Sequence, residues 1–279
     1  MLKLGNVRGR TALRAAGIVL AAATALLVAA PAQAATQTAS AGGVTAIFTY
    51  HGGPFIFHGD TLAIKRHGAV VYSAAVHAQT CGGSCGPNPG GKSVHVVDLE
   101  HNGTKDVVLD LYTEGAHCCF IEQVFYPSGA GYKKVERNIG NPGDEIVDLR
   151  HNGRLEFLTG NDAFSYKFTD YAASGFPIQI LTFAHGRFHD VTRAYPKRIA
   201  KDAKMWLNAF KAMAKDHYSD SEGVIADYAA DEYMLGHQHA VGQFLNQQAN
   251  AGHLNALGSS LSGRKYVVAL MKFLKHQGY

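Results

Sequence analysis

The chain has 279 residues, of which 47% are hydrophobic and 17% charged, so it is long enough for one large or two ordinary domains with an extensive core. Its 26 Lys and Arg residues exceed the 22 Asp and Glu residues, but Lys3, Arg8, Arg10 and Arg14 all precede residue 15. Removing these four leaves 22 basic against 22 acidic residues. Because these charges balance, the composition gives no electrostatic support for binding nucleic acid or an anionic membrane, and we expect neither.

The N-terminus has the pattern of an export signal. After the four basic residues, an uncharged apolar run covers residues 15–30, and Ala32-Gln33-Ala34 supplies a small-x-small cleavage site. The apolar run is shorter than the ~20 residues of a membrane-spanning helix. We therefore expect a signal peptide over residues 1–34, a disordered mature N-terminus over residues 35–43, and an exported protein without a transmembrane anchor.

A β-rich domain is predicted over residues 44–195, where Gly, Val, Phe, Tyr and Thr form short runs separated by glycine turns. The first strands are predicted over residues 44–50, 61–65 and 69–76. Residues 81–91 contain so many glycines and prolines that they exclude both a helix and a central strand. We expect an irregular loop there.

A repeat follows this loop. D-L-E-H-N-G-T-K-D at residues 98–106 returns as D-L-R-H-N-G-R-L-E at residues 148–156. Asn-Gly between apolar runs is typical of a hairpin, because both residues tolerate positive φ. The predicted strands of the two units cover residues 94–99, 106–112, 119–126 and 132–138, then 145–149, 155–160, 177–183 and 187–193. Two four-stranded meanders suggest blade-like sheets, but two blades do not close a propeller. We favour an irregular sandwich with the N-terminal strands over association of several chains.

The repeated loops have the spacing of calcium ligands, because a hard cation binds six or more oxygens from a tight arc of chain. The first loop offers the oxygens of Asp98, Glu100, Asn102, Thr104 and Asp106. The second offers Asp148, Asn152, Glu156 and a carbonyl near Leu155, but its Arg150 would oppose a divalent ion. In the alternative that we favour, the Asp and Asn side chains accept hydrogen bonds from local backbone amides.

Four cysteines, Cys81, Cys85, Cys118 and Cys119, are expected to form disulfides in an exported protein. Adjacent side chains on an extended strand point to opposite faces, so we expect Cys118 and Cys119 to pair with Cys81 and Cys85, in an order left open. The alternative is a zinc or copper(I) site of these thiolates with His117, which oxidation would remove.

One group of residues suggests catalysis. Asp110, Glu114 and His117 lie on the strand and loop after the first repeated turn, where a carboxylate could orient an imidazole for acid–base chemistry. The alternative is that these polar groups cap strand ends. Residues 82–86 also spell G-x-S-x-G, but Pro87 and Pro89 exclude the helix that a nucleophile elbow needs.

The repeated D-L-x-x-N-G-x-x-[DE] pattern resembles the FG-GAP or VCBS type of repeat, whose D-x-D-G-D-G-x-x-D loops bind calcium in extracellular β-propellers. D-L-Y-T-E-G-A-H-C-C (residues 110–119), F-T-D-Y-A-A-S (168–174) and G-R-F-H-D-V-T-R-A-Y-P (186–196) resemble a group of uncharacterised secreted bacterial proteins. The resemblance covers residues 60–196 and implies calcium at the loops. This chain departs from the pattern, because His and Asn replace the Gly-Asp pair in both loops. The resemblance implies no particular activity.

The composition changes near Pro196 to Ala, Leu, Lys, Gln and Met, which predicts a helical domain over residues 196–279. Apolar residues recur there at intervals of three and four, as in Ala203, Trp206, Leu207, Phe210 and Met213. Further stripes cover residues 224–235, 240–249 and 266–273. Four short helices would form a small bundle or cover one sheet edge.

Together these features predict a segregated α+β fold, with antiparallel β-meander repeats followed by a small all-α part. We expect an exported binding or interaction module whose partner is an extracellular or envelope protein or a glycan. Calcium is the cofactor that the sequence suggests. The alternative function is a secreted hydrolase that uses Asp110, Glu114 and His117.

Overall fold

The computed structural model describes residues 34–53, 57–81, 85–115, 117–215, 220–255 and 261–279. It confirms the α+β prediction, with antiparallel meanders that precede four helices. Of the predicted signal peptide, only Ala34 falls within the described residues. In the described part of the chain, no helix is both long and apolar enough to cross a membrane.

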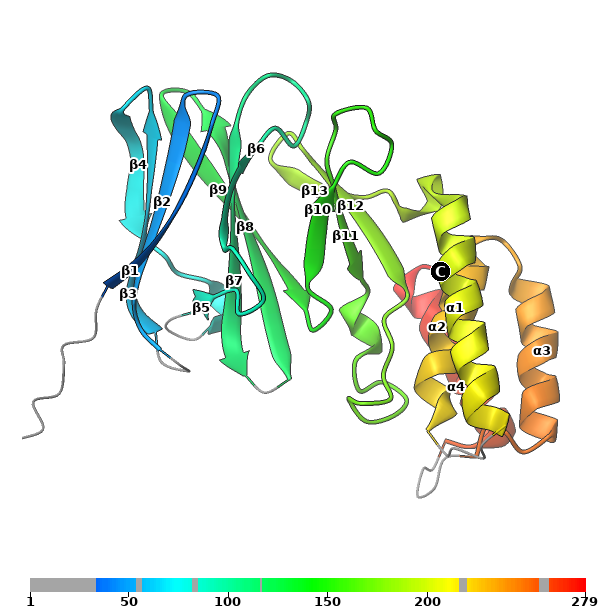
Figure 1. Cartoon of the computed structure of the whole chain (residues 1–279). Coiled ribbons are helices and arrows are strands. Elements are labelled where there is room, and N and C mark those ends of the chain that lie inside the picture. Colours follow the sequence, from blue (N-terminus) through cyan, green and yellow to red (C-terminus); the bar gives the residue numbers. More distant parts are fainter. Residues whose placement is uncertain (1–33, 54–56, 82–84, 116, 216–219, 256–260) are drawn as a thin grey trace, which may run out of the picture. The chain divides into compact units, whose positions relative to one another are not determined.

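Sheet A is a four-stranded antiparallel meander, drawn in blue and cyan in Figure 1. Its strands are β1 (Ala34–Ala41), β2 (Val44–Gly52), β3 (Phe57–Arg66) and β4 (Ala69–Ala75). The prediction of disorder over residues 35–43 is wrong, because β1 pairs along its whole length with β2. The small and polar residues that resemble a linker belong to a largely exposed edge strand.

Sheet B is built around β7, a strand that is buried on both faces. Its strands are β5 (Gly86–Pro87), β6 (Val94–Val97), β7 (Asp106–Gly115), β8 (Cys118–Ser128) and β9 (Gly131–Gly140). Along β7, Val107 and Leu109 belong to one apolar cluster and Val108 to another, so alternate side chains enter different cores. The short strand β5 lies within the segment that was predicted to be irregular.

Sheet C, the second repeat unit, is again a four-stranded antiparallel meander. Its strands are β10 (Asp144–Val147), β11 (Glu156–Gly160), β12 (Ile178–Ala184) and β13 (Arg187–Asp190). A long connection, residues 161–177, joins β11 to β12 and begins with a short 3-10 helix, Asp162–Phe164. The corresponding connection between β7 and β8 has two residues.

Two apolar clusters join the three sheets. Sheets A and B share one cluster, which includes Phe48, Leu62 and Ile64 from sheet A and Leu109, Ile121 and Phe125 from sheet B. Sheets B and C share the other, which includes Val108, Val124, Phe157, Leu181 and Phe183. The β domain therefore contains three blade-like meanders, one more than the repeat in the sequence predicts.

The helices are α1 (Pro196–Lys215), α2 (Ser221–Met234), α3 (Gln238–Asn250) and α4 (Gly263–Gln277), and α1 begins where the composition changes. They share an apolar cluster that also holds Phe164 of the 161–177 connection. Hydrogen bonds tie the C-terminal part to the segments that follow β11 and β13 of sheet C: Asn161 Nδ2 donates to Tyr279 Oη (2.9 Å), and Arg193 donates to the carbonyl oxygens of Met234 (3.0 Å) and Gly278 (3.2 Å).

Candidate functional site

The structure does not gather Asp110, Glu114 and His117 into one site. Asp110 accepts a hydrogen bond from His95 Nε2 at 3.1 Å. Glu114 lies near Asp60 of sheet A, whose pKa is raised to about 6, mainly by burial and further by the charge of Glu114. His117 packs its ring against Tyr171, with ring centroids 4.5 Å apart. Among the described residues, no hydrogen bond or ion pair joins any two of the three predicted residues.

Asp110 instead belongs to a row of polar side chains across sheet B. Glu122 lies opposite Asp110 in the β7–β8 register, and Arg137 lies opposite Glu122 in the β8–β9 register. Asp144 of sheet C approaches the same group and makes a side-chain hydrogen bond with Glu122. Burial, reinforced by the neighbouring carboxylates, raises the pKa of Glu122 well above its usual range. Burial likewise raises the pKa of Asp144 to about 7.

The raised pKa of Glu122 favours a proton on this group of carboxyls. Asp110 Oδ1, Glu122 Oε2 and Asp144 Oδ2 are buried and accept no hydrogen bond from an amide or hydroxyl group among the described residues. A protonated Glu122 can donate to Asp110 or to Asp144, which removes one negative charge and supplies one missing donor. Within the described part of the chain, no three His, Cys, Asp or Glu side chains are arranged to hold a metal ion.

The first repeated loop uses its acidic side chain to bind its own backbone. The two Asp98 oxygens each accept an N–H group, from Asn102 (2.9 Å) and from Gly103 (2.9 Å), and Lys105 Nζ lies 3.4 Å from Oδ2. Burial opposes ionisation of Asp98, but these donors outweigh it and lower its pKa. Left-handed backbone occurs at His101 (φ 54°) and Gly103 (φ 83°) rather than at an Asn-Gly pair. Calcium binding by this loop stays a prediction.

The second loop repeats this geometry. Asp148 accepts from the N–H groups of Asn152 (3.1 Å) and Gly153 (2.7 Å), and the Gly153 donor is the main cause of its lowered pKa. The two loops also contact each other. Leu155 N–H donates to the Leu99 carbonyl (3.3 Å), and a Cβ added to Gly153 would lie 2.3 Å from His101 Nδ1. The repeated loops therefore fix sheet B against sheet C.

The cysteines pair differently from the prediction. Cys81 is bonded to Cys85, and Cys118 is bonded to Cys119. The prediction assumed an extended trans backbone at the adjacent pair, whereas a cis peptide bond joins Cys118 to Cys119 and brings their Cα atoms to 3.1 Å. All four cysteines pack in the cluster between sheets A and B, but each disulfide closes only a local segment.

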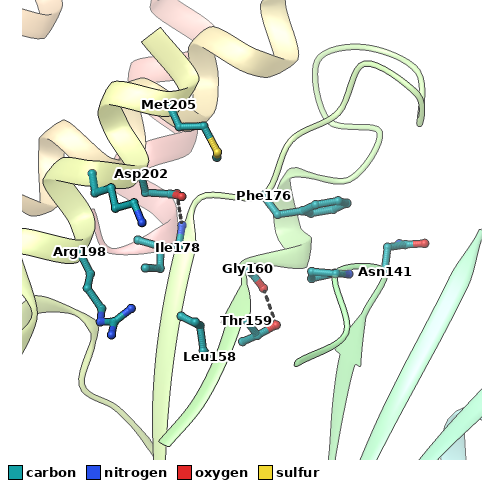
Figure 2. Close-up of a pocket in the computed structure, with 11 residues that line it drawn as sticks. Asn141, Leu158, Thr159, Gly160, Phe176, Ile178, Arg198, Asp202 and Met205 are labelled. Atoms are coloured by element: carbon teal, nitrogen blue, oxygen red, sulfur yellow. Dashed lines mark hydrogen bonds between the residues drawn. The ribbon is translucent and has the colours of Figure 1, made fainter. Parts of the chain in front are cut away.

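A cavity of about 590 Å³ lies between sheet C and helix α1. Figure 2 shows Arg198, Asp202 and Met205 projecting from α1 on one side, with Leu158, Thr159 and Gly160 of β11 across from them. The connections before β10 and β12 add Asn141, Pro142 and Phe176 to the lining, and Ile178 at the start of β12 completes it. Lys201 of α1 adds a second cation. The cavity therefore combines apolar side chains with a small number of polar and charged groups.

Asp202 joins the two sides of this cavity. Its Oδ2 accepts the N–H of Ile178 (3.1 Å) and the indole N–H of Trp206 (3.0 Å). Behind it lie Asp227 and Asp231 of α2, both fully buried. Burial raises the pKa of Asp227 well above its usual range and that of Asp231 to about 10, and Asp231 makes a side-chain hydrogen bond with Asp202. Burial therefore favours the neutral form of both aspartates.

The sequence did not reveal most of these groups. His95 and Glu122 meet Asp110 through strand pairing in sheet B, and Asp144 reaches Glu122 from sheet C, and the sequence states neither arrangement. Arg198 and Lys201 read as ordinary surface residues of a helix. One signal was available: the predicted connection between the second and third strands is much longer in the second repeat unit than in the first, and this connection contributes Phe176 to the cavity.

Comparisons with known proteins give two distant relatives. No family model and no solved structure matches the chain. The chain is 28% identical over 156 residues to a probable thylakoid lumen protein of Synechocystis sp., an alignment that covers 51% of this chain and 44% of that protein. It is 22% identical over 133 residues to an uncharacterized protein of Sinorhizobium fredii, covering 47% of this chain and 21% of that protein. The chain thus spans less than half the length of each relative.

Proposed function

We propose that this chain is an exported binding module that holds a small ligand in the cavity between sheet C and α1. The observation that carries the proposal is the cavity itself, because about 590 Å³ falls within the range of roughly 300–1,000 Å³ typical of ligand sites. Its lining has the usual composition of such sites, with apolar walls and a few polar groups that fix orientation.

The location of the cavity supports this proposal. Its two sides come from different parts of the fold, and Asp202 of α1 fastens them together through the Ile178 N–H. Asn141 is also held in place: its backbone N–H and its Nδ2 both donate to Asp162 Oδ1 at 2.9 Å. A site whose lining residues are anchored by hydrogen bonds loses little freedom when a ligand binds.

Two further parts of the proposal concern export and the repeats. A predicted signal peptide and a relative described as a probable thylakoid lumen protein support export. Three antiparallel sheets, two of them carrying the D-L-x-x-N-G loop, support descent from FG-GAP or VCBS-like repeats. The hydrolase alternative has less support, since its three residues contact different neighbours.

Fluorescent dyes that bind apolar pockets test the proposal. We expect 8-anilinonaphthalene-1-sulfonate to bind the purified chain with one-to-one stoichiometry and to be blocked by Met205→Trp, which fills the cavity mouth. Met271→Trp is the matched control, because Met271 is likewise an exposed helical methionine but does not line the cavity. If the two variants bind the dye equally well, the cavity is not the binding site.

A further inference from the structure

We infer that the ligand of this cavity carries an anionic group on an apolar body, and that Arg198 and Lys201 bind its charge. This inference rests on the proposed function and names the class of ligand. It depends on three observations, which concern the partners of the two cations, their position in the helix, and the charge of the acidic groups behind them.

The first observation is that both cations lack an acidic partner. Arg198 and Lys201 are exposed and line the cavity, yet neither forms an ion pair within 4.0 Å or a side-chain hydrogen bond with any residue that the structure describes. A guanidinium and an ammonium bind carboxylate, sulfonate or phosphate groups through charge-assisted hydrogen bonds. Their donors therefore remain available to a ligand.

The second observation is the position of Arg198 in the first turn of α1. The helix begins at Pro196, and its first turn contains Lys197 and Arg198 but no acidic residue. The positive end of the helix dipole disfavours cations there. The helix therefore carries positive charge where its own stability favours negative charge, and an anion bound at this end would relieve that repulsion.

The third observation is that the aspartates behind the cavity do not neutralise it. Asp227 and Asp231 are fully buried, and burial raises the pKa of both, to about 10 for Asp231, which favours their uncharged forms. Among the described residues, Asp202 is the one acidic group in the lining, and its Oδ2 accepts two N–H donors. Two cations against one such carboxylate leave the cavity positive, while Leu158, Phe176 and Met205 provide apolar surface for the rest of the ligand.

Two dyes with the same skeleton separate the ligand class from binding itself. The anion 8-anilinonaphthalene-1-sulfonate and the neutral N-phenyl-1-naphthylamine differ in one sulfonate. Fluorescence titration should show the anion binding about tenfold more tightly, as expected for a charge-assisted hydrogen bond. The double variant Arg198→Gln/Lys201→Gln should abolish this preference while leaving the neutral dye unaffected.

The matched control is Lys197→Gln/Lys204→Gln, which removes the same charge from the same exposed part of α1 but leaves the cavity lining intact. It should retain the preference for the anion. Equal affinity for both dyes, or equal loss of the preference in the two double variants, would overturn the ligand class while cavity binding stands. If neither dye binds, both this inference and the proposed function fail.

Discussion

Asp106 gives the sharpest test of how buried carboxyl groups control stability. It starts β7, is only 4% exposed, and accepts the Leu99 N–H through Oδ2 at 3.2 Å. Burial is the largest cause that raises its pKa, to about 7 from an ordinary 3.8; the charges of Glu100 and Asp98 add to this, and the Leu99 donor opposes it. Asp106→Asn keeps an oxygen for Leu99 and removes the ionisable group.

The direction in which stability changes with pH follows from proton binding to Asp106. Between pH 3.8 and about 7 the folded protein holds a proton on Asp106 that the unfolded chain has released, so stability falls as pH rises through this window and is level outside it. Each pKa unit corresponds to about 1.36 kcal/mol, so ionising Asp106 costs the folded state about 4 kcal/mol. The variant should match wild type near pH 4 and be more stable by as much as about 4 kcal/mol at pH 8.

Urea unfolding at pH 4, 6 and 8, monitored by circular dichroism, measures this difference. Other raised carboxyl groups, such as Asp60 and Asp144, titrate in the same window, so the difference between variant and wild type is the informative quantity. Asp148→Asn provides a control of opposite sign, because its N–H donors lower its pKa and its loss should destabilise the protein at pH 8. If Asp106→Asn changes stability equally at pH 4 and pH 8, the reasoning is wrong.

Three further predictions concern the repeated loops and the cysteines. For wild type, and separately for Asp98→Ala, the thermal melt with chelator should superimpose on the melt with millimolar calcium, because Asp98 already accepts backbone N–H groups. A rise in Tm with calcium that occurs in wild type and is lost in the variant would instead establish a calcium loop. Intact mass after alkylation should show no free thiol. Proteolysis without reduction should release Cys81 with Cys85 and Cys118 with Cys119 on separate peptides. A disulfide-linked peptide that joins the first pair to the second would support the pairing predicted from the sequence. Gly153→Ala should destabilise the protein by about 1–3 kcal/mol more than Gly103→Ala. Both glycines have a positive φ, but only at residue 153 would the added Cβ clash with His101. Equal decreases in the free energy of unfolding, measured in urea, would show that the contact between the loops does not contribute to stability.

The strands of the repeat units could be predicted because their pattern is local. Alternating or continuous apolar runs between glycine turns mark β2 to β4 and β6 to β13. Strand β1 could not be predicted in the same way, because an exposed edge strand of alanine, threonine and serine has no apolar side to recognise. Its absence from the prediction is the reason that sheet A was not identified as a third meander.

The predicted catalytic group failed for a geometric reason. Asp110 and Glu114 are four residues apart, so on a regular strand their side chains would share a face. The register of β7 with β8 shifts between Tyr112 and Gly115, and Glu114 has a positive φ of 63°. Glu114 therefore approaches Asp60 of sheet A, while Asp110 joins Glu122 and Asp144 at the side of sheet C. No sequence pattern identifies such an irregularity in advance.

The proposed ligand site lies where the second unit departs from the first. In sheet B two residues connect the strands β7 and β8, but in sheet C the equivalent connection runs over residues 161–177. This insertion contributes Phe164 to the helical core and Phe176 to the cavity. A short turn is enough to connect these two strands, as sheet B shows, so residues 161–177 are not needed to form the sheet. The repeat therefore accounts for sheets B and C, and the long connection in the second unit marks where the helices pack and where the cavity forms.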